Sequence, residues 1–351
     1  MKENFYQLNQ NNSSLGKRTG TVKILSITVP SVPLPLELLS RGLFHILALI
    51  VVLSIIGCEK NYFRDYGEKL IISVEWGAKA GKFGLAIPAE GEIVGPRTFT
   101  IGDNGYIHIF DSIKKNIKIF DREGVFQRSV GKGLPGYSFV IYKGFYYLLD
   151  GESVHQYTLE GKPAETYPIA QAITLYEGYG QWMRIDDSGN LYAKSQGKTY
   201  QICEGIGTKN TVLSDKAQIM SERRGTPDSS GTHWVSLAKE SVKRFRLRMH
   251  DKRGNIVNEF PIETPDTFGS VFFLDQDEKG IIYLETQRIG ADGDVKIEIR
   301  RYCDDGRLIQ TVGLPNSYYT IVYKKIFVDK KGFLYQLQTS PAGVKIVKWG
   351  K

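Results

Sequence analysis

The stretch GPRTFTIGDNGYIHIFDSIKKNIKIFDREG, residues 95–124, decides the fold of this 351-residue chain. Two short polar turns, each with a glycine (Gly105 and Gly124), follow runs rich in β-branched and aromatic residues. Acidic or amide residues followed by glycine between such runs indicate tight β-hairpins, because the turn needs a positive φ that glycine adopts without strain. The stretch therefore predicts antiparallel strands joined by two hairpins.

The first of these turns recurs along the chain. Its glycine is followed three positions later by an aromatic residue or a histidine in six segments: Gly105–His108, Gly144–Tyr147, Gly189–Tyr192, Gly231–Trp234, Gly280–Tyr283 and Gly332–Tyr335. Successive glycines are 39, 45, 42, 49 and 52 residues apart, and the second turn returns at Gly124, Gly161, Gly205, Gly254 and Gly306. Each repeat thus predicts four strands, and four strands in about 40–50 residues are typical of a β-propeller blade.

The sequence therefore predicts an all-β fold, a six-bladed β-propeller with four antiparallel strands per blade, over residues 67–351. The predicted blades lie near 92–131, 136–169, 180–213, 229–263, 267–313 and 319–351. The last blade has only three strands of its own, at 321–328, 333–339 and 344–349. We expect a strand at 69–76 to complete it and so close the ring without an open edge.

The same stretch resembles a known repeat. Pro96, the hairpin around Gly105 and the strand 117–124 are similar to the NHL-type six-bladed propeller repeat, with its initial proline, its D-x-x-G-x-I-Y-V-x-D hairpin and its I-x-V-F-D-x-x-G strand. Repeats three, five and six carry the first half of the pattern, and repeats two and four are degenerate. The resemblance extends over nearly the whole chain after residue 58 and implies a fold, not a reaction.

A leader precedes the repeats. Residues 43–57 are apolar apart from His45 and Ser54, and they follow Arg41. Fifteen residues are too few for a comfortable membrane span of about 20 and fit the apolar region of a secretory signal. An uncleaved anchor helix is the alternative. We assign residues 1–57 to a leader and signal peptide.

The end of this leader resembles the bacterial lipobox. Its residues Ile55–Cys58 are Ile-Ile-Gly-Cys. The resemblance implies cleavage after Gly57 and attachment of a lipid to Cys58, so that residues 58–66 form a lipidated tether. It also implies an exported protein of the bacterial cell envelope. Glu59, in place of Asp, follows the cysteine and favours the outer membrane under the enterobacterial sorting rule.

Composition and charge bear on which classes of function the chain can have. The chain is 41% hydrophobic and has a net charge of +8, with no basic stripe or fold motif for nucleic acid. We therefore expect a globular protein that does not bind nucleic acid. Cys203 and Cys303 fall in different repeats and are expected to be separate thiols.

Residues for catalysis are sparse. After residue 58 the chain has four histidines, which show no short ligand spacing: His108, His155, His233 and His250. No cofactor or metal site is predicted, and a binding or scaffold role is favoured over an enzyme. A metal-dependent propeller lyase or hydrolase, with its site on the channel axis, stays open as the alternative.

Residues near the start of each innermost strand are the candidate binding site, because these starts lie at one mouth of a propeller channel. Aromatic and cationic side chains there suit an anionic or carbonyl-rich group of a protein, peptide or glycan partner. Ordinary channel lining is the alternative. The candidates are Arg97, Tyr137, Trp182, Arg184, Phe268, Tyr318 and Tyr319.

A second basic feature lies at 243–253. Strand alternation would place Arg244, Arg246 and Arg248 on one face. This face is either a solvated outer surface or a surface for an anionic envelope partner.

Overall fold

The computed structural model describes residues 67–136, 138–169, 183–195, 198–207, 211–219 and 225–350. The predicted leader, Cys58 and its tether lie outside these ranges. No helix in the described ranges is long and apolar enough to cross a membrane.

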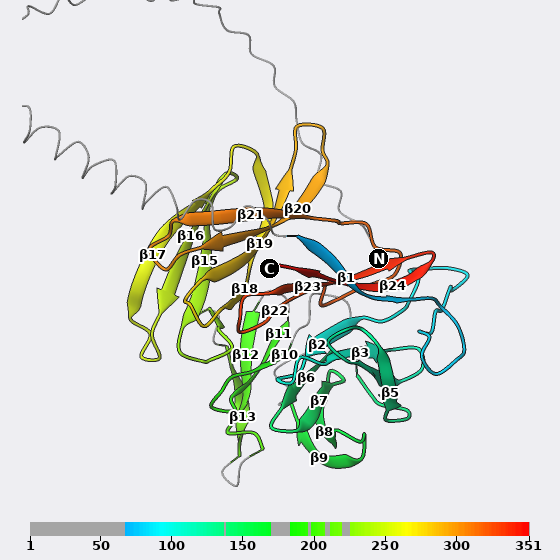
Figure 1. Ribbon diagram of the computed structural model, residues 1–351. Helices are drawn as coiled ribbons and strands as arrows, with labels where there is room; N and C mark the ends of the chain where they lie inside the picture. The colour runs from blue at the N-terminus through cyan, green and yellow to red at the C-terminus, as the bar shows by residue number, and fades with distance from the viewer. Residues whose placement is uncertain are drawn as a thin grey trace, which may run out of the picture. The chain divides into compact units, whose positions relative to one another are not determined.

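Six antiparallel sheets of four strands each make up the fold (Figure 1). Blade one holds β2 Thr98–Ile101, β3 Ile107–Asp111, β4 Asn116–Phe120 and β5 Phe126–Val130. Blade two holds β6 Ser138–Tyr142, β7 Phe145–Leu149, β8 Ser153–Thr158 and β9 Pro163–Pro168. Blade three holds β10 Met183–Ile185, β11 Leu191–Ser195, β12 Lys198–Glu204 and β13 Val212–Ile219.

The second half of the ring follows the same order. Blade four holds β14 Thr226–Pro227, β15 Trp234–Ser241, β16 Arg244–His250 and β17 Ile256–Glu263. Blade five holds β18 Thr267–Gln276, β19 Ile282–Ile289, β20 Val295–Tyr302 and β21 Leu308–Leu314. Blade six holds β22 Ile326–Val328, β23 Leu334–Ser340, β24 Gly343–Trp349 and, at its outer edge, β1 Glu68–Val74. The predicted six-bladed propeller is confirmed.

Strand β1 closes the ring as predicted. It pairs antiparallel with β24, from Glu68 opposite Trp349 to Val74 opposite Val344, so the first and last strands lie side by side (Figure 1). The innermost strand of this blade differs from the prediction, because β22 begins at Ile326 and not at residue 321. The five preceding residues run as a connecting segment instead.

The hairpin glycines have the conformation that the repeat requires. All six first-turn glycines have φ between +67° and +83°. In blade five, Asp277 accepts hydrogen bonds from the turn backbone, and the Tyr283 hydroxyl donates to the Asp277 carboxylate over 2.9 Å. The same hydroxyl lies 3.2 Å from the carbonyl oxygen of Gly332 in blade six. The tyrosine three positions after the glycine therefore joins its own turn to the next blade.

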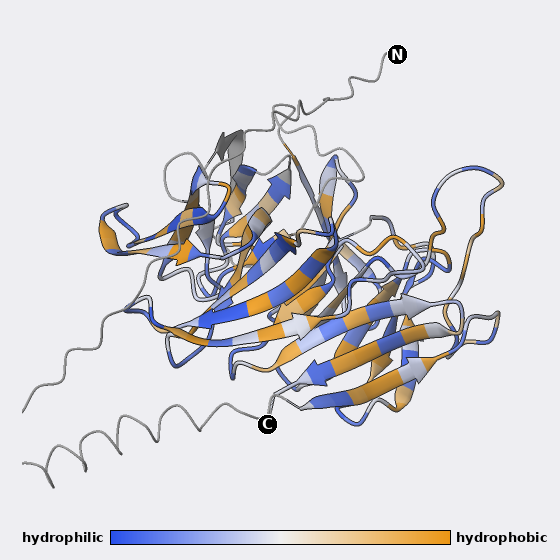
Figure 2. Ribbon diagram, turned by 90° about the horizontal axis from the view of Figure 1, so that it is seen from above, coloured by the Kyte–Doolittle hydropathy of each residue, from blue (hydrophilic) through white to orange (hydrophobic). Residues whose placement is uncertain are grey.

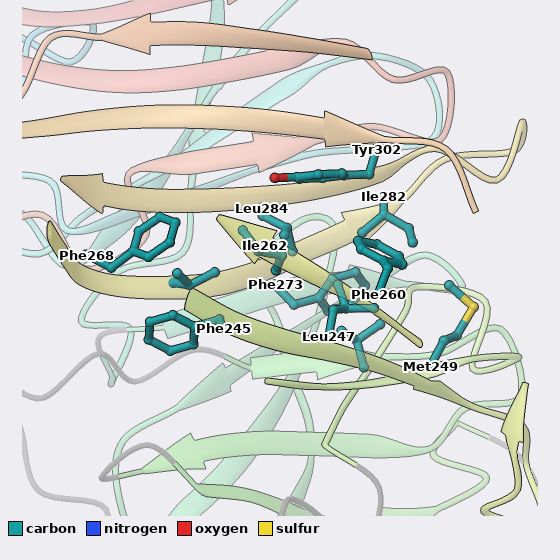
Figure 3. Packing of buried hydrophobic residues seen from close by; sticks show 12 residues of the cluster. Phe245, Leu247, Met249, Phe260, Ile262, Phe268, Phe273, Ile282, Leu284 and Tyr302 are labelled. Atoms are coloured by element: carbon teal, nitrogen blue, oxygen red, sulfur yellow. The ribbon is translucent and has the colours of Figure 1, made fainter. Parts of the chain in front are cut away.

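The core lies between neighbouring blades. Strands alternate hydrophobic and hydrophilic residues (Figure 2), so each sheet can bury side chains against its neighbours. Between blades four and five, Leu247 and Ile262 pack against Phe273 and Leu284 (Figure 3). A fully buried side chain of this size stabilises the fold by about 1.5–3 kcal/mol. Hydrophobic interfaces between neighbouring blades therefore stabilise the fold.

Candidate functional site

The predicted binding residues do not form a single group. Tyr137 and Trp182 lie outside the described residues. Of the other five, Arg97 precedes β2, Arg184 lies within β10, Phe268 lies within β18, and Tyr318 and Tyr319 precede β22.

Arg184 joins three blades. Its guanidinium donates hydrogen bonds to the carbonyl oxygens of Pro227 in blade four and Leu274 in blade five. It also lies 3.4 Å from the carboxylate of Asp275, and both side chains are largely buried. These contacts hold the inner strands together, which is the role of ordinary channel lining.

Phe268 belongs to the core. Its side chain is 1% exposed and meets the Phe245 ring edge to face, with the ring centres 5.5 Å apart (Figure 3). The Arg300 guanidinium lies 5.2 Å from the centre of its ring. Position 268 is the second residue of β18, where alternation turns the side chain toward blade four. It offers little surface to a ligand.

Tyr318 and Tyr319 pack against the second strand of blade six. The Tyr318 hydroxyl accepts a hydrogen bond of 2.9 Å from the Gln336 side chain. The Tyr319 backbone N–H donates to Thr339. Both tyrosines are half-buried and lie beside β23, because the innermost strand begins seven residues later than Tyr319.

Charged side chains from four blades gather near these residues. We call this set the axial cluster: Arg97, Arg184, Lys194, Asp275, Glu285, Lys324 and Lys325. The Lys325 ammonium lies 4.7 Å from the centre of the Tyr318 ring, and the Lys194 ammonium of blade three lies 5.4 Å from that of Phe272 in blade five. The three lysines could not be found from the sequence, because no motif distinguishes them from other lysines on strands.

Arg97 lies beside the lysines of blade six. Its carbonyl oxygen accepts hydrogen bonds from the backbone N–H groups of Tyr323, at 2.8 Å, and Lys324, at 3.2 Å. Its guanidinium lies 5.1 Å from the centre of the Tyr323 ring. The Tyr323 side chain packs against the core between blades two and three. This segment before β22 thus reaches from blade six across to the opposite blades.

Burial shifts the pKa of several members of the cluster. Desolvation raises the pKa of Asp275 and of Glu285, although Arg184 opposes the shift at Asp275 and Lys325 opposes it at Glu285. Desolvation and the Arg184 guanidinium lower the pKa of Lys324 to about 7 and also lower that of Lys194. Both signs of charge are poorly solvated here, as expected inside a ring.

A pocket of about 360 Å³ lies at the face of the first hairpin turns. We call it the mouth pocket. Turns of blades three to six contribute Asp187, the segment 228–233, the segment 276–280 and Lys330. Sequence alone does not indicate this pocket, because its residues are turn residues that the repeat explains without any ligand.

Most residues that line the pocket are of polar types, and an ion pair spans it. The Lys330 ammonium of blade six lies 3.0 Å from the Asp187 carboxylate of blade three, although these blades are opposite in the ring. Asp187 and nearby carboxylates raise the pKa of Lys330. Ser229 donates its backbone N–H to Asp275 over 2.9 Å, so the floor of the pocket adjoins the axial cluster.

The arginines of β16 form a different kind of array. Arg244, Arg246 and Arg248 alternate with buried Phe245, Leu247 and Met249, as predicted. We call the three arginines and their partners on neighbouring strands the arginine ladder. Arg248 lies against Glu259, Arg246 lies between Glu259 and Glu240, and Arg244 lies between Glu240 and Glu263. Three arginines thus meet three glutamates on the face of blade four opposite this core, and all six side chains are partly exposed.

The described residues were also compared with the arrangements that metal sites and disulfides need. There, no three His, Cys, Asp or Glu side chains group closely enough to hold a metal ion. Cys203 is buried and Cys303 is half-buried, and each is a free thiol, as expected.

Known proteins resemble this chain in structure only, and at low sequence identity. No protein-family model matches the chain, and no curated protein matches it. Among solved structures, a streptogramin B lyase is 10% identical with a TM-score of 0.40, over 81% of this chain and 98% of that one. A member of the DUF4221 family from Bacteroides vulgatus is 13% identical with a TM-score of 0.45, over 82% and 98%. The chain is similar to both at low identity.

Proposed function

We propose that this chain is a lipid-anchored, exported binding or scaffold protein of the bacterial cell envelope, and that its partner docks in the mouth pocket. The observation that carries the docking site is the pocket of about 360 Å³ to which four successive blades contribute. Ligand pockets are concave and few per protein, and a mouth assembled from several blades suits a partner that enters along the ring axis.

The pocket lining supports a polar partner. Ser230 and Thr232 present hydroxyl groups, Glu278 presents an exposed carboxylate, and His233 is 34% exposed in its side chain. Hydroxyl, amide and ammonium groups of a peptide or glycan would find acceptors and donors here. The proposed site therefore lies on the turn face of the ring and differs from the predicted strand-start residues.

The envelope location rests on the lipobox-like end of the leader. A diacylglycerol and an N-acyl chain on Cys58 would supply the two hydrophobic anchors that stable membrane attachment needs. Replacing Cys58 by Ser should abolish incorporation of labelled palmitate and move the protein out of the membrane fraction. Palmitate that still enters the Cys58→Ser protein would contradict the anchor while leaving the pocket untouched.

The pocket is tested by photo-crosslinking in the native host. A crosslinking residue at position 230 should give adducts of defined mass, whereas one at exposed Val257 on β17 should not. The adducts should disappear when Glu278 and Lys330 are both changed to Ala, because both side chains line the pocket.

A second pair of substitutions with the same change in charge tests whether the loss of adducts is specific to the pocket. Glu123 and Lys331 are exposed turn residues that do not line the pocket, and changing both to Ala should leave the adducts intact. Equal amounts of adduct from positions 230 and 257 would overturn the proposal. Adducts that still form after Glu278 and Lys330 are changed to Ala would do so as well.

A further inference from the structure

Three polar side chains form a hydrogen-bonded series on the outer half of blade two. Asp150 directly follows β7, His155 lies on β8, and Thr166 lies on β9, the outermost strand of the blade. The His155 Nε2 lies 2.6 Å from the Asp150 carboxylate, and its Nδ1 lies 3.2 Å from the Thr166 hydroxyl. His155 and Thr166 are directly opposite one another in the two strands. A carboxylate, an imidazole and a hydroxyl are thus connected in the order that activates a nucleophile.

The turn between β7 and β8 holds the Asp150 carboxylate. Its Oδ1 accepts hydrogen bonds from the backbone N–H groups of Glu152, at 3.0 Å, and Ser153, at 2.8 Å, and its Oδ2 faces His155. Burial acts to raise the pKa of Asp150, but the hydrogen bonds from His155 and from this backbone lower it overall. The ionised carboxylate can only accept, so the Nε2–H of His155 donates to it. In the neutral imidazole, Nδ1 is then free of a proton and can accept the one on Thr166.

The Thr166 hydroxyl lies beside a small cavity. Thr166 itself is exposed, and it lines a cavity of about 110 Å³ together with His155 and neighbouring residues of β8 and β9. Tyr157 and Pro163 add apolar surface to the lining. The volume is well below the roughly 300–1,000 Å³ of pockets for drug-sized ligands, so a group that enters this cavity must be short.

The backbone of β9 places one more donor at Thr166. Ile169 donates its N–H to Glu152 on the side of β8, and the N–H groups of an antiparallel strand point alternately to its two sides. The N–H groups of Tyr167 and Glu165 therefore face β8 as well, whereas that of Thr166 faces the outer edge, where the sheet of described residues has no further strand. This N–H can stabilise negative charge that develops on an oxygen beside the Thr166 hydroxyl.

We propose that Asp150, His155 and Thr166 form an acyl-transfer site for esters of short carboxylic acids. The Thr166 Oγ attacks the carbonyl carbon of the ester, and its proton passes to Nδ1 of His155. The bond between the carbonyl carbon and the alkoxy oxygen breaks, and His155 returns the proton to the leaving alkoxide, which departs as an alcohol. Water then hydrolyses the acyl-threonine, with His155 again as the base, and releases the carboxylic acid. The site shares no residue with the mouth pocket and does not depend on its partner.

Reaction with p-nitrophenyl acetate tests the site in the full chain held in detergent. Mass spectrometry of the peptide that contains residue 166 should find acetyl on Thr166. The rate of this acetylation should fall about a hundredfold or more in His155→Gln, because a positioned base contributes at least about that factor. Thr166→Val should abolish acetylation at this position, and Thr166→Ser, which keeps a hydroxyl, should retain it.

Asp150 is a positioning residue in this site, because it contacts the imidazole and not the ester. Asp150→Asn should therefore lower kcat for p-nitrophenyl acetate and leave KM nearly unchanged. A merely structural role in the turn between β7 and β8 would not separate the two constants in this way. Equal kcat in Asp150→Asn and the unchanged chain would remove Asp150 from the site.

A second hydroxyl–imidazole pair provides a matched control. The Ser236 Oγ lies 2.9 Å from Nε2 of His250 in blade four, but Nδ1 of that ring lies 3.4 Å from the carbonyl oxygen of Gly254 and not beside a carboxylate. Ser236 should acquire no acetyl group, and Ser236→Ala should leave the acetylation of Thr166 unchanged. No acetyl on Thr166 in the unchanged chain, or equal rates in His155→Gln, would overturn the proposal.

Discussion

The axial cluster and the arginine ladder both concentrate cations, but they bury them to different depths. In the ladder, Arg246 lies between Glu240 and Glu259, and the array has as many glutamates as arginines. In the axial cluster, the ion pair of Arg184 and Asp275 is largely buried, and burial shifts the pKa of Lys324 and Glu285. The ladder is prominent in the sequence and partly exposed, whereas the cluster is scattered over four blades and more deeply buried. The local density of basic residues in the sequence therefore does not predict which charges are buried.

The largest expected difference between the two regions is in stability. Arg184→Ala removes hydrogen bonds to Pro227 and Leu274 and leaves Asp275 buried without its ion pair. We expect it to cost about 2–4 kcal/mol of the free energy of unfolding, measured by urea titration. Arg246→Ala in the ladder should leave the urea midpoint nearly unchanged, because its partners are solvated. Similar urea midpoints for Arg184→Ala and Arg246→Ala would contradict the expected difference in stability between the two regions.

A smaller effect should appear in the dependence of stability on pH. The folded pKa of Lys324 is about 7, below the unfolded value near 10.4, so between these values the unfolded chain binds more protons. The stability of the unchanged chain relative to Lys324→Met should therefore rise from pH 7 to pH 10. The expected rise is on the order of 1 kcal/mol, since partial contact with solvent screens the charge. Parallel stability curves for the two proteins would contradict it.

The smallest effect concerns salt. Arg248 and Arg246 lower the pKa of Glu259, which is exposed. Dissolved ions therefore screen the contribution of these ion pairs to the stability of the fold. The difference in thermal midpoint between the unchanged chain and Glu259→Gln should vanish in about 0.5 M NaCl. The loss caused by Arg184→Ala should persist at the same salt concentration. If the loss of stability in Arg184→Ala also vanished in salt, the ion pair of Arg184 would have to be solvated like those of the ladder.

The sequence predicted the fold well because the determining signals are local. Each turn glycine, such as Gly105 or Gly332, needs only its neighbours to identify a hairpin, and counting the hairpins gives the blades. The closing strand could be inferred because blade six lacked a fourth strand. The error at Ile326 arose because hydrophobic residues from 321 to 328 read as one strand, although the chain turns toward other blades before pairing.

Contacts across the ring are harder to predict from the sequence than the blades are. Phe268 looks like a mouth residue by position, but one step of strand alternation buries it against Phe245. Lys194 and Phe272 are 78 residues apart and meet only when the ring closes. No spacing rule in a single sequence reports such pairs.

Ring closure by β1 also has a consequence for the order of folding. The backbone N–H of Gly350 lies 3.4 Å from the carbonyl oxygen of Gly67, so β1, the first strand of the ring to be synthesised, pairs with β24, the last strand of the ring. Until then β24 has an open edge and β1 has no sheet to join. Contacts so distant in sequence form slowly. We therefore expect a chaperone that shields strand edges to matter most in the interval between the end of synthesis and the pairing of β1 with β24.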